Sequence, residues 1–205
     1  EEVAGALEAE VDYQREAANA VEFSAVMEEA PDVVVPLPAM EFCTERVLAS
    51  EWAEGTRPAD LTSREELRAL TALALEATMA QLLGTNVIHG DPHGGNLLLQ
   101  EAPGGRRRLV YLDFGVLCRV TPAQARGLLL ASAHIRCRRF HALAGALQAM
   151  GVIPPEHSAA EVGEALRAEL GGDAAAAVDQ QALNRAMLRL GLRFRFQFPP
   201  FYMLL

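Results

Sequence analysis

Apolar residues recur at helical spacing along much of the chain, and this pattern predicts most of its helices. Over residues 2–30, Ala, Leu and Val return every three or four positions, and an Ala-Pro-Asp breaker follows. The same spacing predicts a helix over residues 64–83, preceded by Ser63, with Glu66 in the position that a capping box prefers. In the last third of the chain the pattern predicts helices over residues 122–150, 159–170 and 178–191.

Strand-like runs lie between these helices. VVVPLPAMEFC and RVLASEWAEG, joined by a Thr-Glu turn, predict a hairpin over residues 33–55. AEGTRPADLTS is rich in breakers and is the best internal boundary. Two further apolar runs enclose polar loops in VIHGDPHGGNLLLQ, residues 87–100, and LVYLDFGVL, residues 109–117. This order of elements predicts an α+β fold.

Composition excludes some partners. Half of the residues are hydrophobic (51%), which is enough for a core of ordinary size. The net charge is −9, and because phosphate backbones favour basic proteins we expect no nucleic-acid partner. The basic run Arg106-Arg107-Arg108 sits beside glycines, and we expect a solvated turn there. All 18 basic residues are Arg, so the chain contains no Lys.

The cysteines and the two ends of the chain say less about function than the helices and loops do. Cys43, Cys118 and Cys137 are too scattered for a disulfide framework or a zinc knuckle, and we expect them to be reduced and buried. No apolar run reaches the roughly 20 residues that span a bilayer. The chain opens in helical register without Met and ends on an apolar segment, residues 194–205, which we expect to be a core helix cut short.

The polar loops carry candidate chemistry for phosphoryl transfer, in which positioning and charge neutralisation provide the catalysis. Asp91 is placed to orient an attacking hydroxyl and accept its proton. Asn96, five residues later, offers an amide oxygen to a hard cation, and Asp113 at a strand end can bridge that cation to phosphates. The Asp-to-Asn offset equals that of the kinase pattern H-R-D-x-x-x-x-N, with D-F-G further on. We expect His89 to brace the loop by a hydrogen bond.

Simpler interpretations exist for each motif. Asp-Pro-His-Gly alone is a turn, and DFG alone occurs by chance. His89, Asp91 and His93 are also metal-ligand types, but no further His or Cys lies nearby to complete a zinc site. Taken jointly and in order, the motifs favour the phosphoryl-transfer interpretation.

HGDPHGGN and YLDFG resemble the motifs of the UbiB/ADCK family of atypical protein-kinase-like proteins. The family's usual motif has Pro where this chain has Gly94, a change that loosens the turn and removes no ligand. A second match is EAEVDYQREAANAVEFSAV, residues 8–26, which resembles the family's E-x-D-x-x-x-E-A-x-N segment and supplies Glu10, Asp12, Glu16 and Asn19. TERVLASEWAEG resembles the family's strand and hinge.

The resemblance implies a protein-kinase-like fold of two lobes that binds ATP and Mg²⁺. Residues 1–54 would form a partial N-lobe, a helix plus a β-hairpin, and residues 55–205 a mostly helical C-lobe. Adenine would rest against the hinge backbone from Glu51 to Ala53. Asn96 and Asp113 would bind the metal, and Asp91 would be catalytic.

In this family the first helix carries a Glu that pairs with a strand-borne Lys. Glu16, in the EAAN part, resembles that pairing Glu, whereas Glu10 and Asp12 resemble the E-x-D pair that faces the family's N-terminal extension. Glu10 and Glu16 both stay candidates, with Glu16 favoured. Solvent-facing charges on an amphipathic helix are the alternative.

The missing Lys bears on activity. The kinase-type Lys that holds the α- and β-phosphates, and the family's Lys-x-Gly-Gln segment, would lie upstream. The chain is therefore either a fragment of a longer protein or a degenerate member, and the abrupt apolar ends favour a fragment. As written, this polypeptide is expected to be catalytically inactive.

For the full-length protein we expect a kinase-like phosphotransferase or ATPase that uses Mg-ATP and is linked to quinone or isoprenoid-lipid metabolism. The alternatives are a small-molecule kinase of the aminoglycoside or choline type, which lacks the segment from Glu10 to Asn19, and a pseudokinase scaffold without turnover. Nucleotide, a membrane lipid and quinone-pathway proteins are the expected partners. The resemblance suggests a plastid, a mitochondrion or the periphery of a bacterial inner membrane.

Overall fold

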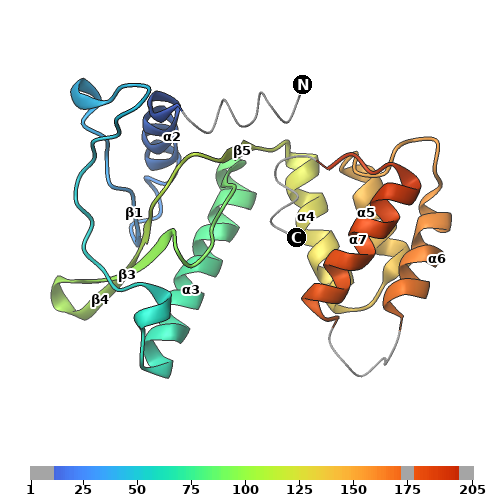
Figure 1. The fold of residues 1–205 in the computed structure, drawn as a ribbon. Coiled ribbons are helices and arrows are strands. Elements are labelled where there is room, and N and C mark those ends of the chain that lie inside the picture. Colours follow the sequence, from blue (N-terminus) through green and yellow to red (C-terminus); the bar gives the residue numbers. More distant parts are fainter. Residues whose placement is uncertain (1–11, 172–177, 199–205) are drawn as a thin grey trace. The chain divides into compact units, whose positions relative to one another are not determined.

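Packing divides the chain into two units, Glu1–Arg119 and Val120–Leu205. The computed structural model describes residues 12–171 and 178–198 (Figure 1). Within these ranges the first unit combines helices with two small sheets, and the second unit is helical. The α+β class is therefore confirmed. The predicted lobe boundary between residues 54 and 55 lies inside the first unit and stays a prediction.

Helix α2 spans Tyr13–Val26, within the first predicted helix. It begins where the Gln14 N–H donates to the Asp12 carboxylate at 3.0 Å, which satisfies one of the unpaired amides of the first turn. Small residues and one aromatic ring form its buried face: Ala17, Ala20 and Phe23. The part of the prediction over residues 2–11 lies outside the described residues.

Three strands form the larger sheet in the order β1-β4-β3. Strands β3 (Leu97–Ala102) and β4 (Arg106–Tyr111) are antiparallel neighbours. Strand β1 (Val33–Val34) pairs with β4 in parallel, with Val33 opposite Leu109. The apolar residues of this sheet pack against α2 and helix α3 (Arg64–Ala80) in one core, whose members include Phe23, Leu70, Leu97, Leu109 and Tyr111.

The hairpin predicted over residues 33–55 is present only in part. The chain reverses and makes two isolated antiparallel bridges, Pro38 with Ser50 and Thr44 with Val47. A 3₁₀ turn over Met40–Phe42 interrupts the ladder. Proline at position 38 has no N–H to donate, so a regular ladder cannot form there.

Helix α3 (Arg64–Ala80) confirms the predicted capping box. The Glu66 N–H donates to Ser63 Oγ at 3.0 Å, and the Ser63 N–H donates to Glu66 Oε2 at 3.1 Å. A π-helical turn over Gln81–Thr85 follows and ends at Asn86, whose φ of 58° is left-handed. The helical region therefore ends within two residues of the predicted position.

The smaller sheet pairs β2 (Val87–His89) with β5 (Leu117–Arg119) in antiparallel register. His89 lies opposite Leu117. This pairing brings the end of the HGD strand beside the chain that leaves the DFG motif, although nearly thirty residues separate the two strands in sequence.

The prediction of a solvated turn at the three consecutive arginines is wrong. The turn between β3 and β4 is made by Pro103–Gly105, so the arginines open β4 itself. Arg106 forms an ion pair with Asp32, and Arg107 Nη1 lies 3.0 Å from Glu65 Oε1.

The second unit consists of four helices in its described part. They are α4 (Pro122–Arg136), α5 (Phe140–Ala149), α6 (Ala159–Leu170) and α7 (Gln180–Phe194). The single helix predicted over residues 122–150 is wrong, because the chain turns at Arg138 with a φ of 53° and divides it into α4 and α5. Apolar spacing is the same on both sides of this turn, which explains why the pattern did not reveal it.

The cysteines correct a further expectation. Cys43 and Cys118 are buried thiols as expected, whereas Cys137 is exposed because it caps α4 at the break between α4 and α5. The core helix expected over residues 194–205 is wrong for its described part, because α7 ends at Phe194 and Arg195 has a left-handed φ of 53°. Phe194 and Phe196 are buried nonetheless, and residues 199–205 lie outside the described residues. In residues 12–171 and 178–198, no helix combines the length and apolarity needed to cross a bilayer.

Two glycines in α4 and α5 give a matched test of this packing. A Cβ on Gly127 would lie 2.2 Å from Cγ of the buried Met150, whereas a Cβ on Gly145 meets no atom within 4 Å. We expect Gly127→Ala to lower the free energy of unfolding by about 1–3 kcal/mol through overpacking. Gly145→Ala should raise it by about 0.5–1 kcal/mol through helix propensity. Urea unfolding of both variants checks this, and a shift of the same sign in both would contradict the packing.

Candidate functional site

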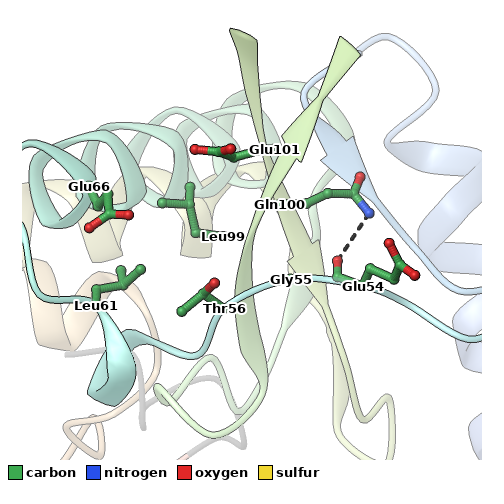
Figure 2. A pocket seen from close by; sticks show the side chains of 8 residues that line it. All are labelled: Glu54, Gly55, Thr56, Leu61, Glu66, Leu99, Gln100 and Glu101. Atoms are coloured by element: carbon green, nitrogen blue, oxygen red, sulfur yellow. Dashed lines mark hydrogen bonds between the residues drawn. The ribbon is translucent and has the colours of Figure 1, made fainter.

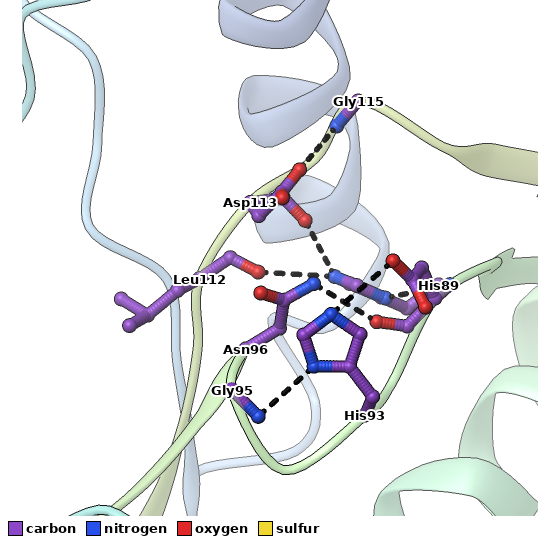
Figure 3. Close-up of polar contacts among 8 residues, drawn as sticks. His89, His93, Gly95, Asn96, Leu112, Asp113 and Gly115 are labelled. Carbon is purple, nitrogen blue, oxygen red and sulfur yellow. Dashed lines mark hydrogen bonds and ion pairs between the residues drawn. The ribbon is translucent and has the colours of Figure 1, made fainter.

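Two polar loops lie side by side at the ends of the strands. The first loop, residues 90–96, joins β2 to β3, and the second loop, residues 112–116, joins β4 to β5. The Leu112 N–H donates to the Asn96 carbonyl at 2.8 Å, which ties the end of the first loop to the start of the second. Figure 3 shows side chains of both loops, among them Asn96 and Asp113, close to the ring of His89.

His89 joins the two loops through its ring. The Asp91 N–H donates to His89 Nδ1 at 3.3 Å. Because Nδ1 accepts, the ring proton is on Nε2, which lies 2.8 Å from the Asp113 carbonyl oxygen and 3.3 Å from that of Leu112. The prediction that His89 braces the loop by a hydrogen bond is confirmed.

The surroundings of His89 keep its ring neutral. The side chain is 1% exposed and packs against the rings of Phe23, Tyr111 and Phe114, with centroid distances of 5.0–5.8 Å. Burial lowers the pKa of His89, against the opposing effect of the carbonyls of Leu112 and Asp113. A second ring proton would also remove the acceptor that the Asp91 N–H needs.

The side chain of Gln81 bonds the backbone of His89, a contact that was not predicted from the sequence. The His89 N–H donates to Gln81 Oε1 at 2.9 Å, and Gln81 Nε2 donates to the Tyr111 hydroxyl at 3.1 Å. Gln81 is 2% exposed, so both bonds lie in the core. The available signal was an amide in the otherwise apolar run MAQLLG just before the HGD strand.

Asn96 is buried and oriented by the first loop. Its side chain is 7% exposed, and Nδ2 donates to the Asp91 carbonyl at 3.1 Å. With the amide nitrogen directed at Asp91, the amide oxygen is left to accept from, or coordinate, a group on its other side.

Asp91 and Asp113 both present exposed carboxylates. Asp113 has a left-handed backbone, with φ at 59°, and its Oδ1 accepts the Gly115 N–H at 3.1 Å. Asp91 Oδ2 lies 3.5 Å from His93 Nε2, and the Gly95 N–H donates to His93 Nδ1 at 2.9 Å. The predicted trio of Asp91, Asn96 and Asp113 is therefore linked through these loops.

Helix α2 holds the second loop from the other side. The Phe114 N–H donates to Glu16 Oε1 at 3.2 Å, and Asn19 Nδ2 donates to the Phe114 carbonyl at 2.8 Å. Burial raises the pKa of Glu16, the hydrogen bond from Phe114 opposes this rise, and the charge of Asp113 adds to it. Sequence reasoning listed Asn19 as part of a motif and gave it no role.

Of the other predicted site residues, Glu51 and Ala53 are in the described part of the chain. Glu51 pairs with Leu37, accepting its N–H at Oε2 (3.1 Å) and donating its own N–H to the Leu37 carbonyl (2.9 Å). Ala53 is half-buried in the irregular chain that precedes Thr56. In the described part of the chain, no hydrogen bond or ion pair joins Glu51 or Ala53 to either loop. Glu10 lies outside the described residues.

A hollow of about 460 Å³ lies beside Thr56 and β3 (Figure 2). Carboxylates of Glu54, Glu66 and Glu101 line it, and Gln100 Nε2 donates to the Glu54 carbonyl at 3.1 Å. It contains none of the predicted site residues. Three carboxylates would repel a triphosphate, so this hollow does not suit nucleotide phosphates.

Comparison with known proteins adds independent information. A family model described as the ABC1 atypical kinase-like domain matches residues 1–137. An uncharacterized protein of Synechocystis sp. is 30% identical over all of this chain and 30% of its own length. A chloroplastic "uncharacterized aarF domain-containing protein kinase" of Arabidopsis thaliana is 32% identical over all of this chain and 29% of its own.

More distant matches agree with these. A "probable protein kinase UbiB" of Xanthomonas oryzae is 32% identical over 57% of this chain and 22% of its own length. The solved complex of Rv3197 with erythromycin from Mycobacterium tuberculosis is similar in fold, with a TM-score of 0.54 and 28% identity over 78% of this chain and 41% of that chain. The chain spans about 30% of the length of the first two relatives.

Two glycines of the first loop differ in what they tolerate. A Cβ on Gly90 would lie 2.4 Å from Val116 Cγ1 and 2.9 Å from Cys118 Sγ, whereas a Cβ on Gly94 meets only Pro58 at 3.6 Å. We expect Gly90→Ala to force β2 and β5 apart and lower the free energy of unfolding by about 1–3 kcal/mol. Gly94→Ala should stay within about 0.5 kcal/mol of the parent. Thermal unfolding of the two variants checks this, and a tolerated Gly90→Ala would contradict the close approach.

Proposed function

The chain belongs to the ABC1 atypical kinase-like family, and we propose that its site binds Mg-ATP and supports transfer or hydrolysis of the terminal phosphoryl group. The observation that carries this proposal is the linkage of Asp91, Asn96 and Asp113. Asn96 donates to the Asp91 carbonyl, and His89 bonds the backbone of both Asp91 and Asp113. Two exposed carboxylates and one buried amide are thereby connected.

The donor set fits Mg²⁺. This ion prefers oxygen ligands and is held by one or two carboxylates together with phosphates and water. Asp113 offers a carboxylate, and Asn96 offers the amide oxygen that its bond to the Asp91 carbonyl leaves available. When bound there, the metal would neutralise charge on the phosphates.

Asp91 suits the role of the base. Its N–H is donated to His89 and its carbonyl accepts from Asn96, so the backbone is held on both sides of the residue. The carboxylate stays exposed and can accept a proton from an attacking hydroxyl or water.

The phosphate-binding Lys must come from outside this chain, which contains none. We propose that it lies in the remainder of a longer protein, since the chain spans about 30% of the length of its relatives. Glu16 would be its partner. One oxygen of Glu16 accepts the Phe114 N–H, and its second oxygen makes no hydrogen bond in the described part of the chain. Alone, this chain is expected to lack phosphotransferase activity.

A nucleotide-binding scaffold without turnover is the second candidate, and the absence of Lys favours it for this chain. The presence of Asp91 beside Asn96 and Asp113 favours the enzyme, because binding Mg-ATP without turnover needs the two metal ligands but no base. The family match over residues 1–137 supports the atypical kinase over a small-molecule kinase of the aminoglycoside or choline type.

The metabolic role proposed for the full-length protein is a link to quinone or isoprenoid-lipid metabolism, with a membrane lipid or quinone-pathway proteins as partners. Relatives named chloroplastic in Arabidopsis and UbiB in Xanthomonas support a plastid or bacterial setting. A mitochondrion stays an alternative.

The direct test uses thermal unfolding of the full-length protein with and without Mg-ATP. Ligand at a hundred times its dissociation constant should add roughly 2.7 kcal/mol to the free energy of unfolding. Asp113→Asn should abolish this gain, because a neutral amide replaces the charged metal ligand. Asp91→Asn should keep the gain and lower the rate of ATP turnover by roughly a hundredfold or more.

Asp60→Asn is the matched control, since Asp60 is an exposed carboxylate in a separate turn. It should leave both the gain and the turnover unchanged. No gain in the parent protein at saturating Mg-ATP would refute nucleotide binding. Gain without turnover in the parent would identify a scaffold, and retained turnover in the Asp91 variant would remove its assigned role.

A further inference from the structure

We propose that Asn19 is a positioning residue for Asp113, acting through the carbonyl of Phe114; the consequence for metal binding rests on the function proposed above. Asn19 Nδ2 donates to the Phe114 carbonyl at 2.8 Å across 95 residues of sequence. Among the described residues this is the one hydrogen bond that the Asn19 side chain makes.

The residue just before the peptide that Asn19 holds has an uncommon backbone conformation. Asp113 has a φ of 59°, a left-handed value that is uncommon outside glycine, although Asp adopts it more often than most residues do. Such a conformation persists where the surroundings determine it more strongly than local preference does. If Asp113 relaxed to an extended conformation, the peptides on both sides of it would rotate, and its carboxylate would point elsewhere.

Two long-range hydrogen bonds oppose that rotation directly, and a third holds the peptide that follows. The Asp113 carbonyl accepts from His89 Nε2, the Phe114 N–H donates to Glu16, and the Phe114 carbonyl accepts from Asn19. The first two fix the peptide between Asp113 and Phe114. Asn19 fixes the next peptide, so that two consecutive peptide planes are held.

The spacing of Glu16 and Asn19 explains how one helix holds both groups of Phe114. Residues three apart on a helix lie on the same face, so an acceptor and a donor project together toward the loop. The carbonyl of Phe114 requires a donor, and at neutral pH an Asp in place of Asn19 offers none. The amide at position 19 is therefore matched to its target in chemistry as well as in place.

The test compares three variants of the full-length protein. Asn19→Ala removes the donor, Asn19→Asp keeps the size and removes the donor, and Gln14→Ala removes an exposed amide from the same helix as the matched control. Hydrogen exchange of the peptide covering residues 112–116 is measured without ligand. We expect roughly two- to tenfold faster exchange in both Asn19 variants, the factor that one hydrogen bond is worth, and no change in Gln14→Ala.

The second readout is the Mg²⁺ concentration that half-saturates ATP binding. Both Asn19 variants should raise it by roughly two- to tenfold, with ATP affinity at saturating Mg²⁺ within about twofold of the parent. A residue that merely stabilises the fold would lower the melting temperature and leave this Mg²⁺ concentration unchanged.

The outcomes separate the two proposals. Unchanged exchange at residues 112–116 in a folded Asn19→Asp protein overturns the positioning role, whatever the nucleotide data show. Faster exchange with an unchanged Mg²⁺ requirement also overturns it, because the hydrogen bond from Asn19 to the Phe114 carbonyl would then have no effect on metal binding by Asp113. If the Asn19 variants exchange faster but the parent protein binds no Mg-ATP, the positioning role of Asn19 is supported and the proposed function is refuted.

Discussion

A buried imidazole joins the two loops of the site and holds the backbone at both Asp91 and Asp113. His89 accepts the Asp91 N–H at one nitrogen and donates to the Asp113 carbonyl from the other. These two bonds require a neutral ring with its proton on Nε2. Burial among three aromatic rings lowers the pKa of His89 and favours that form. Packing in the core therefore determines a hydrogen-bond pattern at the surface.

The site is built so that its backbone is restrained while its carboxylates face solvent. Asn96 and His89 hold the main chain around Asp91, and α2 holds the main chain after Asp113. Ordering these groups before a ligand arrives lowers the entropic cost of binding. Phosphoryl transfer depends on positioning and charge more than on covalent chemistry, so this kind of restraint is what the reaction requires.

Local sequence patterns predicted most of the helices, whereas contacts between residues far apart in the sequence were not predicted. The capping box at Ser63 is a local pattern that the structure contains, and the short spacing of Asp91 and Asn96 is local too, with a hydrogen bond between them. The parallel pairing of β1 with β4 joins residues more than seventy positions apart, which hydrophobic periodicity does not encode. For the same reason the contacts of Gln81 and Asn19 were not predicted from the sequence. An amide on a helix has no partner in its own sequence neighbourhood that would reveal its target.

The most direct measurement is a crystal structure of the full-length protein with Mg²⁺ and a non-hydrolysable ATP analogue. We predict one metal bound by the Asn96 amide oxygen and the Asp113 carboxylate, at the roughly 2.0–2.1 Å typical of Mg²⁺. The Asn96 amide nitrogen should still donate to the Asp91 carbonyl. A metal held by neither residue, or an Asn96 whose nitrogen faces the metal, would contradict the proposed metal site.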